Sequence, residues 1–236
     1  MIVFENVTKQ FNKLKVLNSV NLKLEKGECI ALIGPNGCGK TTIIKSLLGM
    51  VIPSSGNIFF NDMSILKNIV YREKIGYMPQ IGRYPENMTI GQVFNMVKEI
   101  RQYKGKLDEE LFFQFELDKI LNKKMRTLSG GTTQKVSASL TFLFNPEVLI
   151  LDEPTAGLDP LASELLKNKI LSEKQRGKLI LITSHLLSEL DGLVSQIIFM
   201  HEGNILFKKS LFDLKLETKL DKLSDSIVYL LKKNKI

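Results

Sequence analysis

Apolar and polar residues alternate over much of the first 28 residues of the chain. Ile2, Phe4 and Val7 lead into a polar break that contains Phe11, and a clean alternation follows over Val16–Leu24. A period of two predicts strands with one buried face, and a polar break between two such strands predicts a turn. We therefore expect an antiparallel sheet at the start of the chain.

Three later segments are continuously apolar instead of alternating: Cys29–Ile33, Val148–Leu151 and Leu179–Ile182. Such runs predict parallel strands that are buried on both faces. Apolar residues at helical spacing follow the first run over Thr42–Leu48, and Leu161–Gln175 has a helical pattern between the other two. Strands that alternate with helices indicate an α/β fold with a mostly parallel central sheet.

The remaining segments add further elements to this sheet. Asn57–Phe60 and Lys74–Gln80 predict short strands, and Gln196–Phe207 predicts a hairpin that turns at a glycine. From Ile90 to about Phe144 the apolar spacing is helical, which predicts a helical insertion. The lysine-rich tail Leu211–Ile236 is amphipathic, so we expect it to be helical.

The composition is that of a globular domain, with 44% hydrophobic and 25% charged residues in 236. No apolar run reaches the length of a membrane span, and the N-terminus lacks the pattern of a signal peptide. We therefore expect a cytoplasmic protein. Cys29 and Cys38 are too few for a metal cluster, and a disulfide is not expected.

The formal net charge of +8 has three interpretations. The lysines are spread along the chain, and no long basic block contains interleaved aromatic residues. This distribution favours a solvated surface first, proximity to an anionic membrane second and nucleic-acid binding last.

One glycine-rich stretch fits the P-loop pattern G-x-x-x-x-G-K-[ST]. In such a loop, backbone N–H groups turn inward and surround phosphates, the lysine contacts the β- and γ-phosphates, and the hydroxyl holds Mg²⁺. A chance glycine-rich turn is the alternative, but the strand before the stretch and the helix after it favour the P-loop. The predicted nucleotide ligands are Gly34, Pro35, Asn36, Gly37, Cys38, Gly39, Lys40, Thr41 and Thr42, with Thr41 also a metal ligand.

Asp152 and Glu153 follow the second apolar run. Acidic side chains at the carboxyl end of a parallel strand face the ligand crevice of an α/β sheet. Asp152 would bind Mg²⁺ and Glu153 would polarise an attacking water, with side chains on opposite sides as in a strand. An ordinary strand end is the alternative, and the P-loop makes it the weaker one.

The stretch Leu128-Ser129-Gly130-Gly131-Thr132-Thr133-Gln134 lies between these two motifs. It resembles the signature L-S-G-G-x-x-Q of the nucleotide-binding subunits of ABC transporters. Physically, a serine followed by two glycines would open a helix and offer donors to a phosphate. The resemblance implies that ATP is contacted by Ser129, Gly130, Gly131 and Gln134.

The resemblance extends in the family's order from about Ile2 to Phe207. It implies that Gln80 senses Mg²⁺ and the attacking water, that Asp159 crosses a dimer interface and contacts the nucleotide site, and that His185 contacts the γ-phosphate. Glu153, His185 and Gln80 are thus the catalytic candidates, Thr41, Gln80 and Asp152 the metal ligands, and Phe11 the ring that stacks on the base. Cys38 and Lys135 depart from the commonest residues of the family.

The family also implies an organisation for the chain: a P-loop NTPase core over about 1–84 and 146–210, including an antiparallel β part, a helical subdomain over about 85–145 and a helical tail over about 211–236. All belong to one ABC ATPase domain. ATP and Mg²⁺ are the implied cofactors.

The implied partners are a second ATPase subunit, as a homodimer or a paired subunit, and transmembrane permease subunits that hold the chain at the inner face of the cell membrane. Nucleic acid is not expected. Tyr84–Ile90 resembles exporter subunits, in particular the ATPases of copper-processing, nitrous-oxide-reductase maturation systems, with a lipid, drug or peptide exporter as the rival. Soluble ABC ATPases of DNA repair or translation are the alternative class, and a P-loop GTPase or kinase is a third.

Overall fold

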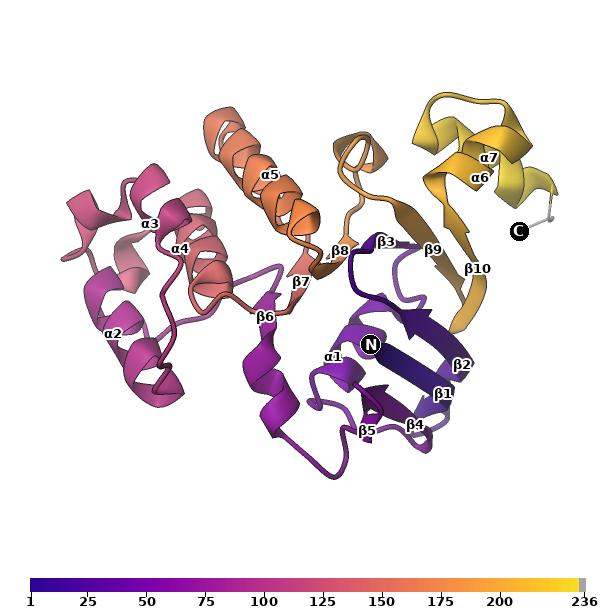
Figure 1. Cartoon of the computed structure of the whole chain (residues 1–236), viewed down its shortest axis with the longest axis horizontal. Coiled ribbons are helices and arrows are strands. Elements are labelled where there is room, and N and C mark those ends of the chain that lie inside the picture. Colours follow the sequence, from indigo (N-terminus) through magenta and orange to yellow (C-terminus); the bar gives the residue numbers. More distant parts are fainter. Residues whose placement is uncertain (234–236) are drawn as a thin grey trace. The chain divides into compact units, whose positions relative to one another are not determined.

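The computed structural model describes residues 1–233, and the chain forms two compact units. The first unit comprises Met1–Arg72 and the chain from Leu179 onward, and the second comprises Glu73–Lys178 (Figure 1). Each unit is described by itself. The expected subdomain boundaries near residues 84 and 145 stay a prediction, and the last three residues of the expected tail helix lie outside the described part.

An antiparallel sheet opens the first unit, as the alternation predicts. Its strands run in the order β2-β1-β4-β5 and comprise β1 (Ile2–Phe11), β2 (Leu14–Leu24), β4 (Ser55–Phe60) and β5 (Met63–Ser64). Ile2, Phe4 and Val7 are buried on one face. The break between β1 and β2 is shorter than expected, because β1 continues to Phe11.

A second group of strands in this unit comprises β3 (Cys29–Ile33), β8 (Leu179–Thr183), β9 (Gln196–His201) and β10 (Asn204–Ser210). β3, β8 and most of β9 are buried, whereas β10 is partly exposed. β3 pairs in parallel with both β8 and β9, and β10 returns antiparallel to β9. The hairpin turns at Glu202 and Gly203, which have φ angles of 44° and 77°. Two consecutive left-handed residues give the turn whose twist matches a two-residue hairpin.

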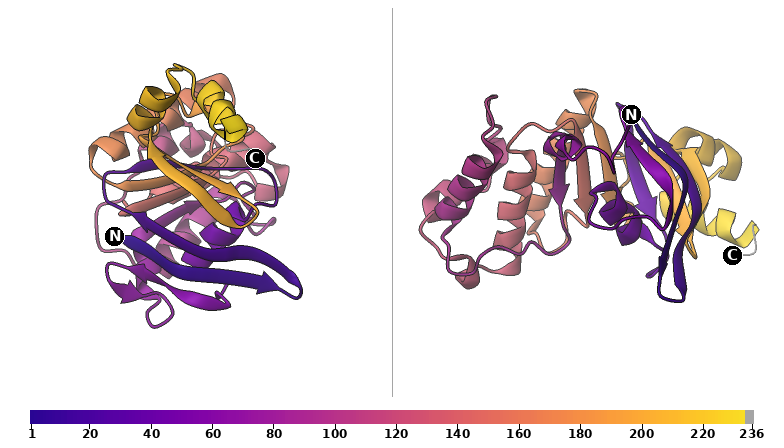
Figure 2. Two further views of the ribbon diagram at one scale, coloured as in Figure 1. Left: turned by 90° about the vertical axis from the view of Figure 1, so that its right-hand side faces the viewer. Right: turned by 90° about the horizontal axis from the view of Figure 1, so that it is seen from below.

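Three helices accompany these strands: α1 (Lys40–Leu47), α6 (Leu211–Thr218) and α7 (Leu223–Lys233). In both views of Figure 2 the yellow α6–α7 pair lies next to β9 and β10. Buried Leu214 of α6 and buried Leu223, Ile227 and Leu230 of α7 carry the apolar face of the tail. The amphipathic pattern of the tail therefore corresponds to two short helices joined near residue 220.

The second unit contains the predicted helical insertion. Strands β6 (Ile75–Met78) and β7 (Val148–Asp152) pair in parallel, and the helices are α2 (Ile90–Arg101), α3 (Glu110–Gln114), α4 (Gly130–Phe142) and α5 (Pro160–Gln175). Thr89 and Gln92 form a capping box that starts α2. Left-handed Gln102 ends α2 and divides the insertion, which the apolar spacing alone does not reveal.

A buried ion-pair cluster joins α5 to the segment before α3. The ammonium group of Lys169, which is 2% exposed, lies 2.6 Å from Asp108, 2.7 Å from Glu110 and 3.1 Å from Glu173. Burial lowers the pKa of Lys169, but hydrogen bonds to Asp108 and Glu110 outweigh it, so the net shift is upward. Fully buried Glu173 also pairs with Arg176.

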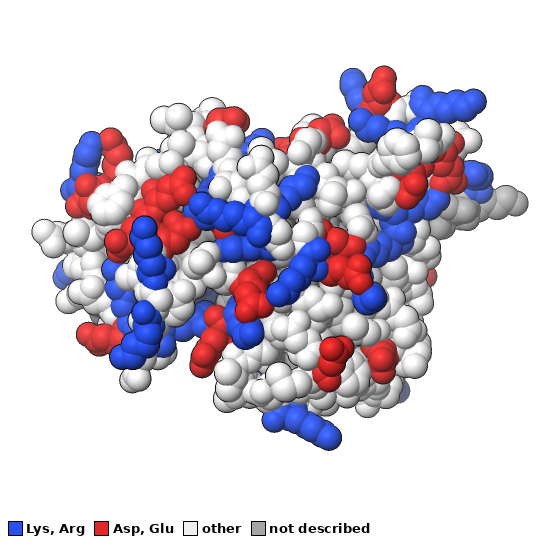
Figure 3. Space-filling view, viewed as in Figure 1, with Lys and Arg blue, Asp and Glu red and all other residues white. Residues whose placement is uncertain are grey.

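On the face drawn in Figure 3, basic and acidic side chains alternate over short distances. Such mixing is typical of a solvated surface. In the part of the chain that the structure describes, no helix combines the length and apolarity needed to cross a bilayer.

Candidate functional site

The P-loop joins the end of β3 to the start of α1 through three glycines with positive φ. Gly34, Gly37 and Gly39 have φ angles of 151°, 77° and 112°. A Cβ on Gly34 would lie 2.2 Å from the Met200 carbonyl oxygen, and one on Gly39 would lie 2.9 Å from that of Val16. Glycine is required here, because the loop passes between β9 and β2 with no room for a side chain.

Lys40 and the first turn of α1 give the loop its positive character. The ammonium group of Lys40 donates to the carbonyl oxygens of Gly34 at 2.7 Å and Pro35 at 3.1 Å. No side chain caps the N-terminus of α1, since Gly39 occupies the capping position. The first N–H groups of the helix therefore face an anion-binding position, next to the exposed Thr41.

Cys38 takes the place of a small residue in the loop without opening it. The residue is 3% exposed, and its carbonyl oxygen accepts a hydrogen bond from the Gly203 backbone at 3.0 Å. The Lys40 ammonium lies 3.9 Å from its Sγ. Cys38 and Cys29 are both buried, and neither forms a disulfide within the described residues.

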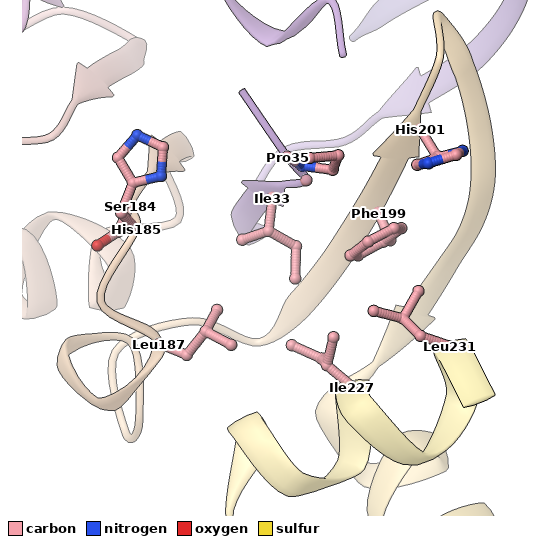
Figure 4. A pocket seen from close by; sticks show the side chains of 10 residues that line it. Ile33, Pro35, Ser184, His185, Leu187, Phe199, His201, Ile227 and Leu231 are labelled. Atoms are coloured by element: carbon pink, nitrogen blue, oxygen red, sulfur yellow. The ribbon is translucent and has the colours of Figure 1, made fainter. Parts of the chain in front are cut away.

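His185 follows β8 and lies beside the start of the P-loop. Its side chain lines a cavity of about 390 Å³ together with Gly34 and Pro35 (Figure 4). The parallel pairing of β3 with β8 brings these distant residues together. The expected contact of His185 with a γ-phosphate stays a prediction. His201, for which the sequence suggested no role, lines the same cavity.

Phe11 ends β1 at the tip of the β1–β2 hairpin. Its ring is 45% exposed, and the Lys9 ammonium lies 4.9 Å from the ring centroid. An exposed ring of this kind is available to stack on a base. That role stays a prediction.

In the second unit, the acidic pair and Gln80 gather at the carboxyl edge of β6 and β7. Asp152 is the last residue of β7, and exposed Gln80 follows the end of β6 by two residues. Burial, and after it the charge of Asp152, raise the pKa of Tyr77 on β6. The sequence had given no indication that Tyr77 lies at this edge.

Glu153 lies outside the strand, in the left-handed region with φ of 53°. The expected strand-like alternation with Asp152 is therefore wrong. A non-glycine residue costs about 1–2 kcal/mol in this conformation. Strain of this kind persists only where the surrounding structure holds it, and it concentrates at functional sites.

The signature stretch opens α4 as expected. The Ser129 hydroxyl caps the helix by accepting from the Thr132 backbone N–H at 3.2 Å. Gly130 and Gly131 form the first turn, where N–H groups are available to a phosphate. Gln134 is 4% exposed, and its side-chain nitrogen is buried without a hydrogen-bond partner among the described residues. Its expected contact with ATP stays a prediction.

An ion pair and a close backbone contact link the signature stretch to the segment around Asp159. Lys135 lies 2.6 Å from the Asp159 carboxylate, which also caps α5 by accepting from the Ala162 N–H at 2.9 Å. The hydrogen bond from Lys135, followed by that from Ala162, lowers the pKa of Asp159. A Cβ on Gly131 would lie 2.6 Å from the Gly157 carbonyl oxygen, so the two backbones are in close contact.

The stretch after Gln80 lies against α4. Burial raises the pKa of Tyr84, and a hydrogen bond with Ser137 of α4 opposes that rise. A cavity of about 480 Å³ opens beside it and is lined by Gly82, Arg83, Tyr84, Glu86, Met125, Arg126 and Thr133. Sequence spacing alone gave no sign of the Tyr84–Ser137 contact.

The candidate residues thus form two groups. The first unit brings together the P-loop and His185 and also carries Phe11. The second unit carries Gln80, Ser129, Gly130, Gly131, Gln134, Asp152, Glu153 and Asp159.

Comparison with known proteins identifies one family, and the similar proteins below are ATP-binding proteins of transport systems. The family described as ABC transporter matches residues 17–156. The lantibiotic transport ATP-binding protein SrtF of Streptococcus pyogenes is 34% identical over 209 residues, covering 89% of this chain and 90% of that protein. The Nod factor export ATP-binding protein I of Burkholderia lata is 33% identical over 210 residues, covering 86% of this chain and 68% of that protein.

Solved structures have the same fold. A structure of an ATP-binding subunit of an ABC transporter has a TM-score of 0.89 and 28% identity, covering 98% of this chain and 99% of that chain. A dimeric structure of the ATP-binding cassette MJ0796 in a post-hydrolysis state, bound to ADP and Pi, has a TM-score of 0.78 and 23% identity over 89% of this chain and 99% of that chain. The likeness to MJ0796 shows the fold alone.

Proposed function

We propose, from the premise that this chain belongs to the ABC transporter family, that it drives export through a separate membrane permease. Its role as the ATP-binding subunit and its ATPase activity come with the family. The name of the Nod factor export protein supports transport outward in particular. A role in DNA repair or translation is not favoured.

The observation that carries the proposal is the P-loop with His185 beside it. Lys40 would exchange the carbonyls of Gly34 and Pro35 for phosphate oxygens, which are stronger, charged acceptors. His185 would then contact the γ-phosphate. Glu153 would orient the attacking water, with Gln80 assisting it, since phosphoryl transfer depends mainly on positioning and charge stabilisation.

The donors that these motifs offer fit Mg²⁺. Proteins hold this ion through one or two oxygen ligands together with substrate phosphates, and it prefers hard oxygen donors. The Thr41 hydroxyl is exposed at the start of α1, Asp152 ends β7 half-buried, and Gln80 offers an amide oxygen. The ion would neutralise charge on the phosphates of bound ATP.

We further propose that two such subunits pair around ATP. The open first turn of α4, with Ser129 and two glycines, suits the phosphates of a nucleotide held by the P-loop of a second copy. The dimeric MJ0796 structure supports this arrangement by fold likeness. The ion pair between Lys135 and Asp159 would hold the signature stretch and the segment around Asp159 in a fixed relative position at that interface.

The permease would dock at the 480 Å³ cavity beside Tyr84 and hold the chain at the inner face of the cell membrane. The cavity presents Arg83, Arg126 and Glu86, which suits a polar cytoplasmic segment of a partner. A cysteine at Glu86 or Asn87 should cross-link to a membrane subunit when the complex is purified from its own cells. A cysteine at exposed Glu164 on α5 is the matched control. Cross-links from Glu86 only to ribosomal or DNA-bound proteins would contradict the permease assignment.

A narrower proposal is that the permease belongs to a copper-processing, nitrous-oxide-reductase maturation system. A lipid, drug or peptide exporter is the rival, and the lantibiotic transport named for SrtF supports a peptide. For a copper-processing system, copper-loaded donor protein should stimulate ATP turnover in the purified complex, and peptide should not. The reverse result would identify a peptide exporter.

A further inference from the structure

We propose that the cavity beside His185 is a second ligand site, for a small aromatic molecule that carries one anionic group (Figure 4). Its volume of about 390 Å³ lies in the range of small-molecule pockets. It opens where β3, β8 and β9 end, and the carboxyl ends of parallel strands are where α/β sheets bind ligands.

The floor and walls of the cavity are apolar and partly aromatic. Ile33 comes from β3, Leu187 from the segment after β8, and Ile227 and Leu231 lie one helical turn apart on α7. The Phe199 ring faces the cavity and stacks on Phe207, with centroids 5.5 Å apart and planes 17° apart, which fixes its orientation. A flat apolar ligand would find both area and a ring to stack on.

The polar groups of the cavity favour an anion. Both histidines of the chain, His185 and His201, are among its lining residues, and none of the described lining residues is a carboxylate. An imidazole offers an N–H donor when neutral and two when charged. The Ser184 hydroxyl is engaged with the backbone of Leu186, and His185 is assigned to the γ-phosphate, so recognition of the anionic head falls to His201.

The cavity meets the expected ATP site at Gly34, Pro35 and His185, and it extends from there over apolar residues to which no ATP contact is assigned. The Lys40 ammonium, the α1 N-terminus and Phe11 are not among its lining residues, and it shares with the P-loop only Gly34 and Pro35. Binding therefore does not depend on the proposed function. A ligand that touches Pro35 and His185 would also alter ATP turnover, and that consequence does rest on the proposed function.

The test uses the full chain and two fluorescent probes of nearly the same shape. 8-Anilinonaphthalene-1-sulfonate carries one anionic group, and N-phenyl-1-naphthylamine lacks it. Leu231→Trp would fill the cavity from α7, whereas Val228→Trp, on the same helix and 48% exposed, leaves it open. We expect Leu231→Trp to weaken the binding of both probes by about tenfold or more and Val228→Trp to leave it unchanged.

The anionic preference is tested with His201→Leu, which should weaken binding of the sulfonate at least about fivefold and leave the neutral probe unaffected. Equal sulfonate binding by the wild type and Leu231→Trp overturns the site, and equal effects of His201→Leu on both probes overturn the anionic preference. If Leu231→Trp does not fold, Leu187→Trp fills the cavity from the opposite wall. Lys40→Ala should lose ATP affinity but still bind both probes. A failure of the nucleotide assignment can therefore be distinguished from a failure of the proposed second site.

Discussion

Gly34 and Gly37 lie three residues apart in the P-loop, yet they need glycine for different reasons. Gly37 has open space around it and only its φ of 77° excludes other residues, so Gly37→Ala should cost about 1–2 kcal/mol of unfolding free energy. Gly34→Ala should cost clearly more, because its Cβ would lie 2.2 Å from the Met200 carbonyl oxygen. Urea unfolding of the two variants measures the difference. Equal losses would mean that the backbone of β9 moves aside without cost.

Glu153 permits a test that separates chemistry from binding. Glu153→Gln keeps the shape of the side chain and removes its charge, so ATP should still bind while turnover falls by roughly two to four powers of ten. Asp152→Asn should instead weaken Mg²⁺-dependent binding. Nucleotide titrations and single-turnover hydrolysis distinguish the two effects. Wild-type turnover by Glu153→Gln would remove Glu153 from the assigned role.

At the residue scale, the sequence predicted which residue types the candidate site contains better than it predicted their backbone conformations. The P-loop pattern is enough to locate the loop, because the chemistry demands Gly34, Gly39, Lys40 and Thr41 at that spacing. It does not reveal that Glu153 leaves the strand. The residue before a proline favours extended backbone, and Glu153 precedes Pro154 yet has φ of 53°. Only tertiary packing can hold such a conformation.

At the scale of elements, Lys169 determines how α5 is held. Lys169→Met would leave Glu173 and Asp108 without their shared cation, and breaking a buried ion pair costs about 3–5 kcal/mol. Lys167→Met, on a less buried face of the same helix, should change stability little. Chemical unfolding of both variants checks this. A loss below about 1 kcal/mol for Lys169→Met would show that Arg176 and Lys178, which also pair with Glu173, suffice.

The raised pKa of Lys169 sets the pH range of that contribution. A lysine whose pKa is higher in the folded chain stabilises fully below its unfolded pKa of about 10.4 and loses its effect as pH rises through the folded value. The stability gap between the wild type and Lys169→Met should therefore be constant from about pH 6 to 9 and close in more alkaline solution. A gap that already closes near pH 7 would point to a different group.

Strand and helix identities followed from periodicity, but this ion-pair cluster did not. Lysine and glutamate are almost never fully buried, so a pattern of apolar positions assigns Lys169 and Glu173 to the outer face of α5. Their burial depends on Asp108 and Glu110, about sixty residues earlier. A helical spacing contains no information on such a partner.

For the whole molecule, the proposed pairing around ATP predicts a change of oligomeric state. Glu153→Gln with ATP should elute as a dimer in gel filtration, since blocked hydrolysis keeps the two signature stretches on the nucleotides. The same variant carrying Lys40→Ala should elute as a monomer, because it lacks the contact of Lys40 with phosphate. A monomer under all nucleotide conditions would contradict the paired arrangement.

The order of the strands in the sheet is another whole-molecule property that the sequence left open. Continuous apolar runs predict buried parallel strands, yet nothing in them states that β3 lies between β8 and β9. That order places His185 and His201 at one cavity with the P-loop. The role of His185 came from the family resemblance, and His201 was found only through the fold.

The lysine of the P-loop, already engaged by two carbonyl oxygens, has a consequence for selectivity. An ammonium group has three N–H donors, and two of those of Lys40 already donate to carbonyl oxygens at 2.7 and 3.1 Å, so an anion that is to contact more than the third donor must replace these bonds. A single inorganic phosphate or sulfate replaces those contacts with little gain. A triphosphate, which the backbone N–H groups of the loop and the start of α1 can contact at several points at once, compensates for that loss, so the loop favours it over inorganic phosphate and sulfate before any nucleotide base is recognised.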